Sequence, residues 1–342
     1  MGPRMIANVN SPVTRNDGQT TTAPGGLLGP ISALAREKKT WSPALLAGVL
    51  WRALTNIGTL QEVVQLLKLQ PFAEAARFSP RFAFKYLTND YLVRGFTMTE
   101  RVCCFVHHYR RLHEVLPDRL LRQALRGDVT LHEIPDCENR FTLSMGYSRA
   151  YDKEGELSLN LHVDGQIVFL LSFTIVPGWV VKSEAAEILL ITRIQGMKGT
   201  SRQIHLATKV LHEVGPGALL LAALQGIAMV FGIGELAAVS ATRQSSYNKE
   251  LAATFQTAYD DFFAELGIPR CPAGFFFSPV PVEDKPLACI KQGHKLRTRE
   301  KRTFKQQIQL ACAGFFEEFA PVSSHELEPA GPGDCQQPVP LT

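Results

Sequence analysis

The period of the hydrophobic pattern changes after Pro135, and this change constrains the fold more than any other feature of the chain. Before it, apolar residues recur at helical spacing; after it, they alternate with polar residues, as in strands with one buried face. The pair Asp164-Gly165 follows the second alternating run and suits the left-handed backbone angles of a tight hairpin turn. The segments that we predict as strands are residues 141–145, 157–163, 167–176 and 187–196.

The segments beyond residue 196 predict parallel connections. A helix at 201–214 and a nearly all-apolar helix at 218–231 separate the fourth strand from a fifth at 235–241. Helices between consecutive strands are typical of βαβ crossovers, so we expect strands 188–194 and 235–241 to be parallel neighbours. The remaining predicted elements are a helix through 259–267, a short strand near 274–280 and a helix at 297–319.

Together these elements predict a mixed α/β sheet, with an antiparallel meander followed by βαβ crossovers. This is the core layout of acyl-coenzyme A-dependent N-acyltransferases, and we therefore expect a GNAT-like fold. Residues 1–40 and 321–342 lack periodicity and predict a disordered arm and a disordered tail. Residues 41–135 predict a helical region that packs on the core at 136–320.

The stretch ERVCCFVHHYRRLHEVLP, residues 100–117, gathers two cysteines and three histidines on one predicted helix. At about 100° per residue, Val102, Phe105, Val106, Tyr109, Leu112, His113 and Leu116 share a face, while His107 and His108 point away from it and from each other. Each Cys–His pair at i, i+4 supplies two ligands, whereas zinc needs three or four. The pattern favours an amphipathic helix over a metal site, and we predict no metal.

Composition limits the class of protein. No apolar run in the 342 residues reaches the roughly 18 residues that span a bilayer, and the N-terminus lacks the apolar segment of a secretory signal. Seven scattered cysteines indicate free thiols, so we expect a cytoplasmic protein with at most peripheral membrane contact. Residues 291–305 hold seven basic side chains and one acidic one, which we interpret as a solvated helix face because no aromatics interleave. Nucleic-acid binding is therefore not favoured.

Several stretches resemble the VirK/YbjX family of bacterial proteins. They are CFVHHYRRL at 104–112, KEGELSLNL at 153–161, the block from 193 to 233 that begins RIQGMKGTSR, and YDDFFAELG at 259–267. The resemblance covers roughly residues 45–320. It implies a domain without an agreed biochemical activity, linked to virulence and to tolerance of cationic antimicrobial peptides, with no catalytic residues to carry over. One departure is ATRQSSYNKE at 241–250, where we expect a short polar element with a histidine.

The turn after the fourth predicted strand is the best candidate binding site. Two glycines at a strand-to-helix turn let backbone N–H groups approach a pyrophosphate, and the helix N-terminus favours its charge. The turn resembles the acyltransferase pattern Arg/Gln-x-x-Gly-x-Gly, with two residues between the glycines instead of one. A simple turn remains the alternative. The predicted coenzyme-binding residues are Arg193, Gln195, Gly196, Lys198, Gly199, Thr200 and Arg202.

Acyl transfer to an amine needs a base for the amine and an acid for the departing thiolate. Position in the predicted sheet suggests Glu184 or Glu187 as the base and Tyr247 or Tyr259 as the acid. Gln225 stands alone as a polar residue in an apolar helix and needs a partner, either structural or a ligand.

His205 and His212 lie i, i+7 on the helix after the glycine turn, and we expect both to face solvent. The sequence thus predicts an acyltransferase-like enzyme with an acyl-coenzyme A donor and a small-molecule or peptide amine as acceptor. The alternative is a non-catalytic protein on the same fold that binds a peptide, lipid or envelope partner.

Overall fold

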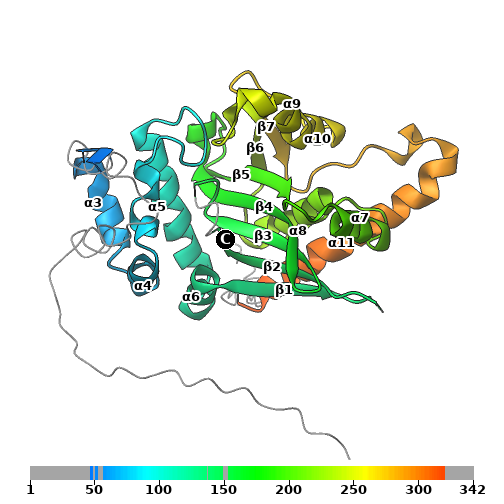
Figure 1. Cartoon of the computed structure of the whole chain (residues 1–342), viewed down its shortest axis with the longest axis horizontal. Helices are drawn as coiled ribbons and strands as arrows, with labels where there is room; N and C mark the ends of the chain where they lie inside the picture. Colours follow the sequence, from blue (N-terminus) through cyan, green and yellow to red (C-terminus); the bar gives the residue numbers. More distant parts are fainter. Residues whose placement is uncertain (1–46, 49–50, 53–56, 137, 149–152, 320–342) are drawn as a thin grey trace, which may run out of the picture.

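A computed structural model describes residues 47–48, 51–52, 57–136, 138–148 and 153–319 of the chain. Its centre is one seven-stranded sheet whose spatial order follows the chain from β1 to β7 (Figure 1). The arm and tail predicted at 1–40 and 321–342 lie outside the described residues. The strands are β1 Asp128–Ile134, β2 Phe141–Tyr147, β3 Leu157–Val163, β4 Gln166–Pro177, β5 Glu187–Gly196, β6 Glu235–Val239 and β7 Phe275–Pro279.

The sheet is mixed, as the sequence predicts. Strands β1 to β5 form an antiparallel meander, β5 pairs with β6 in parallel, and β6 pairs with β7 antiparallel. The turn between β3 and β4 has positive φ at Asp164 and Gly165, which explains the Asp-Gly pair. The expected parallel pairing of the fourth and fifth predicted strands is confirmed by β5 and β6, with α7 (Ser201–Val210) and α8 (Pro216–Val230) between them.

Two helices cover one side of the sheet. Helix α8, Pro216–Val230, is apolar on nearly every side because it packs between the sheet and the long helix α11, Lys295–Glu317. The two helices approach closely at Gly226, where a Cβ would collide with the carbonyl of Gln309. Among the described residues, no helix combines the length and the apolar character needed to cross a bilayer.

Gln225 has structural partners within this layer. Its Oε1 accepts from the Val282 backbone N–H at 2.6 Å, and its Nε2 donates to the Leu221 carbonyl at 3.3 Å. Of the two roles that the sequence left open, the structural one therefore accounts for both ends of the amide.

In the described part of the chain, helices α3 to α6 precede the sheet and lie beside it in Figure 1, to the left of the strands. Their bounds are α3 Ile57–Leu66, α4 Gln70–Phe78, α5 Met98–Val115 and α6 Asp118–Arg126. The predicted helical region extends too far, because residues 128–134 form the edge strand β1. The buried positions of that strand are Val129, Leu131 and Ile134. Their near-alternating spacing was not recognised in the sequence because it follows directly on helical segments.

Helix α5 begins with a capping box. The Thr97 hydroxyl accepts from the Glu100 N–H, and the Glu100 carboxylate accepts from the Thr97 N–H at 2.7 Å. The predicted apolar face is buried, but His113 is exposed whereas Cys104 and His108 are fully buried. The helix packs against β4 on one side and α3 on another, so it buries more than a single amphipathic stripe.

The basic residues of α11 lie mostly beside acidic partners. Arg297 and Lys301 pair with Glu213, while Arg302 and Lys305 pair with Asp284. This arrangement fits a solvated, ion-paired helix face. The helix before α8, α7 at Ser201–Val210, is shorter than the predicted 201–214, because the chain turns through positive φ at His212 and Glu213.

Candidate functional site

Two buried glutamates flank one glycine at the start of β3. The segment Glu154-Gly155-Glu156, here the EGE segment, passes so close to β4 that a Cβ on Gly155 would lie 2.7 Å from the Ser172 Cβ. Gly155 also has φ +147°, a conformation that L-residues rarely adopt. Glycine is therefore required here, and the close approach directs the two carboxylates into separate polar clusters.

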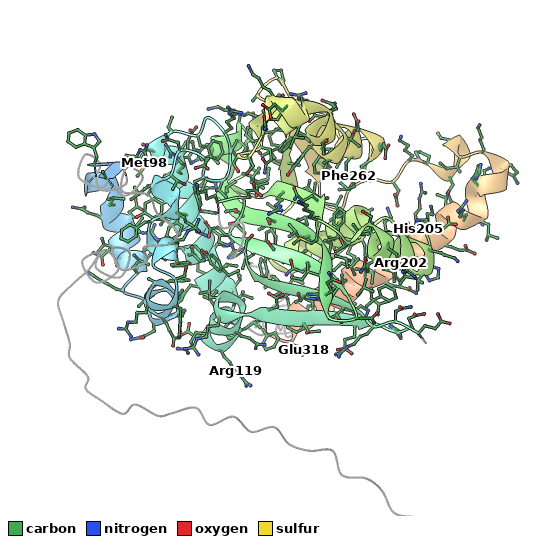
Figure 2. All side chains as sticks on the ribbon, in the orientation of Figure 1. Met98, Arg119, Arg202, His205, Phe262 and Glu318 are labelled. Atoms are coloured by element: carbon green, nitrogen blue, oxygen red, sulfur yellow. The ribbon has the colours of Figure 1, made fainter. Side chains whose placement is uncertain are left out.

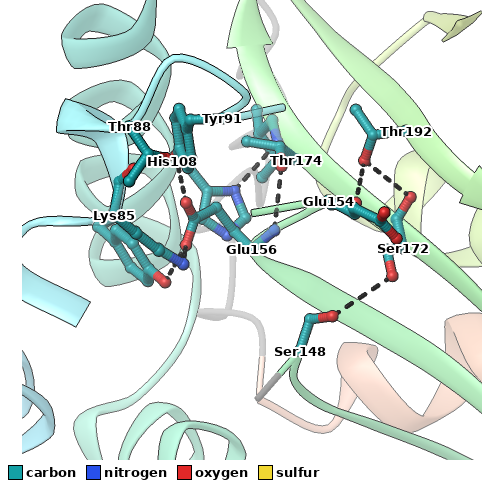
Figure 3. Close-up of polar contacts among 12 residues, drawn as sticks. Lys85, Thr88, Tyr91, His108, Ser148, Glu154, Glu156, Ser172, Thr174 and Thr192 are labelled. Carbon is teal, nitrogen blue, oxygen red and sulfur yellow. Dashed lines mark hydrogen bonds and ion pairs between the residues drawn. The ribbon is translucent and has the colours of Figure 1, made fainter. Parts of the chain in front are cut away.

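Glu156 is the centre of the first cluster (Figure 3). Its carboxylate pairs with the Lys85 ammonium and accepts hydrogen bonds from the Tyr91 and Tyr109 hydroxyls. Glu156 is 0% exposed and Lys85 is 1% exposed. Burial raises the pKa of both tyrosines, and the negative Glu156 raises it further, so the phenols stay protonated and act as donors. The cluster ties the N-terminal helices to the sheet.

His108 forms a hydrogen bond with the backbone of β4 beside this cluster. Pairing between β3 and β4 ends at Phe173, so the Ile175 N–H has no strand partner and donates to His108 Nδ1 at 3.0 Å. Burial, and then the nearby Lys85 charge, lower the pKa of His108 well below its ordinary value. The ring is therefore neutral, with its proton on Nε2, which has no hydrogen-bond partner among the described residues.

Glu154 is the centre of the second cluster. Arg193 of β5 lies 3.1 Å from its carboxylate and is 2% exposed, and Ser246 donates to the same carboxylate. The Thr192 hydroxyl donates to the Glu154 carbonyl, which fixes the segment against β5. Tyr259 lies nearby, and burial raises its pKa, with the Glu154 charge adding to the increase. This cluster joins three parts of the chain that are far apart in sequence.

A row of polar side chains crosses the same region of the sheet. Strand register places Ser144 opposite Asn160, and aligns Ser158, Ser172 and Arg193 across β3, β4 and β5. The Ser158 and Ser172 hydroxyls lie 2.7 Å apart, and Figure 3 shows Ser148 reaching the same oxygen. Positions two apart on a strand share a face. A row of polar side chains therefore crosses one buried face of the sheet.

The outer end of this polar row carries a carboxylate. Asp128 of β1 accepts from Ser144 at 3.1 Å and from Asn160 at 3.2 Å, and lies 3.6 Å from His162 Nε2. The same imidazole nitrogen lies 2.8 Å from the Ser144 hydroxyl. A single nitrogen faces both the serine and the aspartate, so the group lacks the relay geometry of a Ser-His-Asp triad.

Strand β6 ends at Val239, so β5 continues beyond its parallel partner at this site. Their parallel pairing covers only Leu189 to Ile191, while β5 continues to Gly196. The register with β4 shifts between Ile191 and Arg193, leaving Thr192 as the extra residue of a bulge. Beyond it, Tyr259 rather than β6 stands beside the backbone of Ile194. The part of β5 beyond the end of β6 leads directly to the predicted glycine turn.

The glycine turn brings some of the predicted residues together. Gly199 has φ +82° and open space around it, and Lys198 and Arg202 are exposed. Thr200 is buried and donates to the Val168 carbonyl at 3.1 Å, so it anchors the turn to β4. Helix α7 follows without a side-chain cap, which leaves its first N–H groups for another acceptor. Figure 2 shows Arg202 and His205 projecting outward from α7.

Other predicted residues lie apart from the turn surface. Arg193 is held by Glu154 in the interior, and Gln195 and Gly196 form the half-buried end of β5. Gly196 packs beneath Ile204 of α7. Thus Lys198, Gly199 and Arg202 form the open part of the turn, while Arg193 and Thr200 support it from within.

Glu187 lies at the opposite end of β5. It binds Arg111 Nε at 2.9 Å and His107 Nε2 at 3.1 Å, both from α5. An extended strand spans about 30 Å between residues 187 and 196. Glu184 is exposed in the loop before β5. The two predicted bases are therefore separated from the glycine turn by the length of the strand.

The predicted tyrosine acids lie close to each other. Tyr247 and Tyr259 both contact Phe255, with ring centroids 5.4 and 6.1 Å from it. Tyr247 is half-buried and faces the Arg94 guanidinium at 5.9 Å, whereas Tyr259 is buried beside Glu154 and Arg193. Of the pair, Tyr259 is the one that joins the polar clusters.

Sequence reasoning missed the two EGE glutamates and their partners. The stretch 153–161 was recognised as a family motif, but its two glutamates were not predicted as site residues. A local signal did exist, since two carboxylates flank a glycine directly before an alternating strand. The partners Lys85, Tyr91 and Tyr109 have no such signal, because they come from the N-terminal helical region.

Comparison with known proteins yields one match. The family model described as "Protein of unknown function (DUF535)" matches residues 47–312, which is most of the chain. No curated protein and no solved structure matches. The matched range includes the EGE segment, both clusters and the glycine turn.

Proposed function

The chain belongs to the VirK/YbjX family (DUF535), and we propose that it is an acyl-coenzyme A-dependent N-acyltransferase with a GNAT-like core. The observation that carries the proposal is that β5 continues beyond the end of β6 to a glycine turn with exposed cationic side chains. Beyond the end of β6, Gln195 and Gly196 of β5 are half-buried, and an extended ligand arm would lie along them. The turn beside them offers N–H groups and positive charge for phosphates.

The residues of the turn fit a coenzyme pyrophosphate. Backbone N–H groups of Gly199 and of the first turn of α7 would hold it, and Lys198 and Arg202 would add charge-assisted contacts. Nothing lies within 4 Å of a Cβ built on Gly199, so a ligand can approach the backbone there. When bound, the donor supplies an activated thioester acyl group.

The chain's own groups are suited to moving protons near this point. Tyr259 keeps its proton because burial raises its pKa, so the phenol can act only as a donor, and it lies beside the Ile194 backbone of β5. The Glu154 charge raises the pKa of Tyr259, and the Glu154 carboxylate is held by Arg193 and Ser246. We assign Glu154 rather than Glu187 to the amine side, since Glu187 is bound to two α5 side chains at the far end of β5.

The polar row supports an amine as acceptor. Hydroxyl and amide groups on the row would accept from an ammonium group, and Asp128 at its outer end is anionic. The hydrogen bond from His162 is the main cause that lowers the pKa of Asp128. A small polar amine matches this set of acceptors better than an apolar one.

Calorimetry with acetyl-coenzyme A and a long-chain acyl-coenzyme A tests the donor site. We expect Lys198→Ala to weaken binding by roughly 10- to 150-fold, as for loss of one charge-assisted contact of about 1.5–3 kcal/mol. Gly199→Val should block close approach of the phosphates. The matched control is Lys209→Ala, an exposed lysine at the other end of α7. Equal binding by all four proteins, or no heat at millimolar donor, would exclude this site.

A non-catalytic protein on the same fold is the second candidate. Its support is the burial of both EGE carboxylates, each already paired with a basic side chain. Paired, buried charges often stabilise a fold without reacting. Release of free coenzyme A during incubation with a panel of small amines separates the two candidates. Donor binding without any release, with every amine, favours the binding protein.

A further inference from the structure

A group of exposed arginines lies on the outer side of α6, away from the candidate site. Arg119, Arg122 and Arg126 fall within about 60° of each other around the helix, at about 100° per residue. The opposite side of α6 is buried through Leu120, Leu121, Ala124 and Leu125. Figure 2 shows Arg119 projecting from the edge of the molecule. This stripe is not needed for packing of the helix.

The end of α4 extends the stripe with an exposed aromatic ring. Phe78 is 67% exposed, and the Arg126 guanidinium lies 4.8 Å from its centroid. Arg77, also exposed, precedes it. The Phe78 ring adds an exposed apolar group to this cationic side of the molecule. We call Arg77, Phe78, Arg119, Arg122 and Arg126 the arginine–phenylalanine surface.

This surface keeps a positive charge after its internal ion pairs are counted. Arg122 lies 3.7 Å from Asp118, and Arg126 pairs with Glu74. Among the described residues, Arg77 and Arg119 have no acidic partner. Four arginines and two carboxylates leave a net charge of +2. The surface is therefore able to take anionic ligands without first breaking an ion pair.

A shallow hollow lies between the arginines. It has a volume of about 530 Å³ and is lined by Arg119, Arg122, Gln123, Arg126 and Gly127. Guanidinium groups bind phosphate oxygens through paired N–H donors. The hollow is thus suited to phosphate-bearing headgroups, while Phe78 at its end is suited to an apolar environment.

We propose that the arginine–phenylalanine surface docks the protein reversibly on an anionic phospholipid bilayer. Arginines beside an exposed aromatic ring match the headgroup and acyl boundary of such a membrane. Nucleic acid is disfavoured, because a single phenylalanine offers no series of stacking platforms. This inference is independent of acyl transfer and does not involve the residues of the glycine turn or the EGE segment.

Co-sedimentation with vesicles tests the proposal. The full chain should bind vesicles of equal phosphatidylglycerol and phosphatidylcholine at low salt, and bind pure phosphatidylcholine vesicles far less. Arg119→Gln/Arg122→Gln should reduce partitioning roughly 10- to 30-fold, at about one kcal/mol for each arginine. Phe78→Ser should reduce it by roughly 10-fold. The matched control is Lys291→Gln/Arg299→Gln, which removes the same charge from exposed positions elsewhere and should bind as wild type.

The opposite results would overturn the proposal. Undiminished binding by the double arginine variant, or an equal loss in the control pair, would show that general charge rather than this surface is responsible. Equal affinity for duplex DNA, unaffected by Phe78→Ser, would indicate a polyanion site instead of a bilayer site. No binding to the anionic vesicles at low salt would refute docking outright. Thermal unfolding of each variant shows that it is folded.

Discussion

The two halves of the candidate site differ in how their charges are satisfied. In the EGE clusters, Lys85 and Arg193 are buried and face carboxylates inside the protein. At the glycine turn, Lys198 and Arg202 are exposed, and Gly199 has open space above it. Charges that are paired inside the folded protein hold it in one geometry, whereas exposed charges remain available to bind a ligand. On the proposed function, the clusters position the site and the turn is the half that would bind the donor.

The largest effect should come from removing the carboxylate of Glu156. Glu156→Gln removes the carboxylate that pairs with the buried Lys85, and we expect a loss of about 3–5 kcal/mol in the free energy of unfolding. Urea denaturation measures this. The control, Glu62→Gln, removes an exposed pair with Arg110 and should cost less than about 1 kcal/mol. Similar losses in the two variants would mean that the buried pair contributes no more to stability than the exposed pair.

A matched pair of glycine substitutions sharpens the comparison. Gly155→Ala adds a Cβ against Ser172 at an unfavourable φ, and should cost about 2–3 kcal/mol. Gly199→Ala meets no neighbour and should cost about 1 kcal/mol, from its positive φ alone. Unfolding by urea under identical conditions compares them. If Gly199→Ala proved the more damaging, the turn would be part of the packed structure.

The pH dependence of stability should reveal the buried His108. Its pKa is lowered in the folded state, so below about pH 6.5 the unfolded chain binds a proton that the folded chain does not. Stability therefore falls as the pH decreases, by about 1.4 kcal/mol between pH 7.5 and 5.5. We expect His108→Gln to lack this component, whereas exposed His205→Gln retains it. The same pH slope in wild type and His108→Gln would contradict a neutral buried imidazole.

The smallest effect is expected on α11. Arg297→Gln/Arg299→Gln/Lys301→Gln removes charges that are exposed or paired at the surface with Glu213, and should leave the urea midpoint and donor binding unchanged. A salt-dependent affinity for DNA that this variant lost would instead make the helix a nucleic-acid surface.

More of the sheet than of the candidate site could be predicted from the sequence. Alternation between 141 and 163, the Asp-Gly turn and the helices before residue 235 are local signals, and they gave the meander and the parallel pair correctly. The edge strand β1 was missed because its short alternating run follows directly on helical segments. The helical pattern placed His113 on the buried face, but the structure buries His108 instead. Helix α5 packs against two partners, and a pattern that assumes one buried face does not include the second.

The site depends on pairs that are distant in sequence. Glu156 meets Lys85, and Glu187 meets Arg111, only because the N-terminal helices fold against β4 and β5. No spacing rule links such residues. The glycine turn could be recognised because all of its residues are consecutive, but which of them face solvent depends on the Glu154–Arg193 pair.

Amide hydrogen exchange with and without acetyl-coenzyme A tests the central claim most directly. The account predicts that donor slows exchange at residues 196–203, where the open N–H groups lie, and leaves residues 153–160 unchanged because they are already held by the buried clusters. Lys198→Ala should show the same pattern only at higher donor concentration. Slower exchange confined to 153–160, or no change at 196–203 at saturating donor, would contradict the assignment of the turn as the binding half of the site.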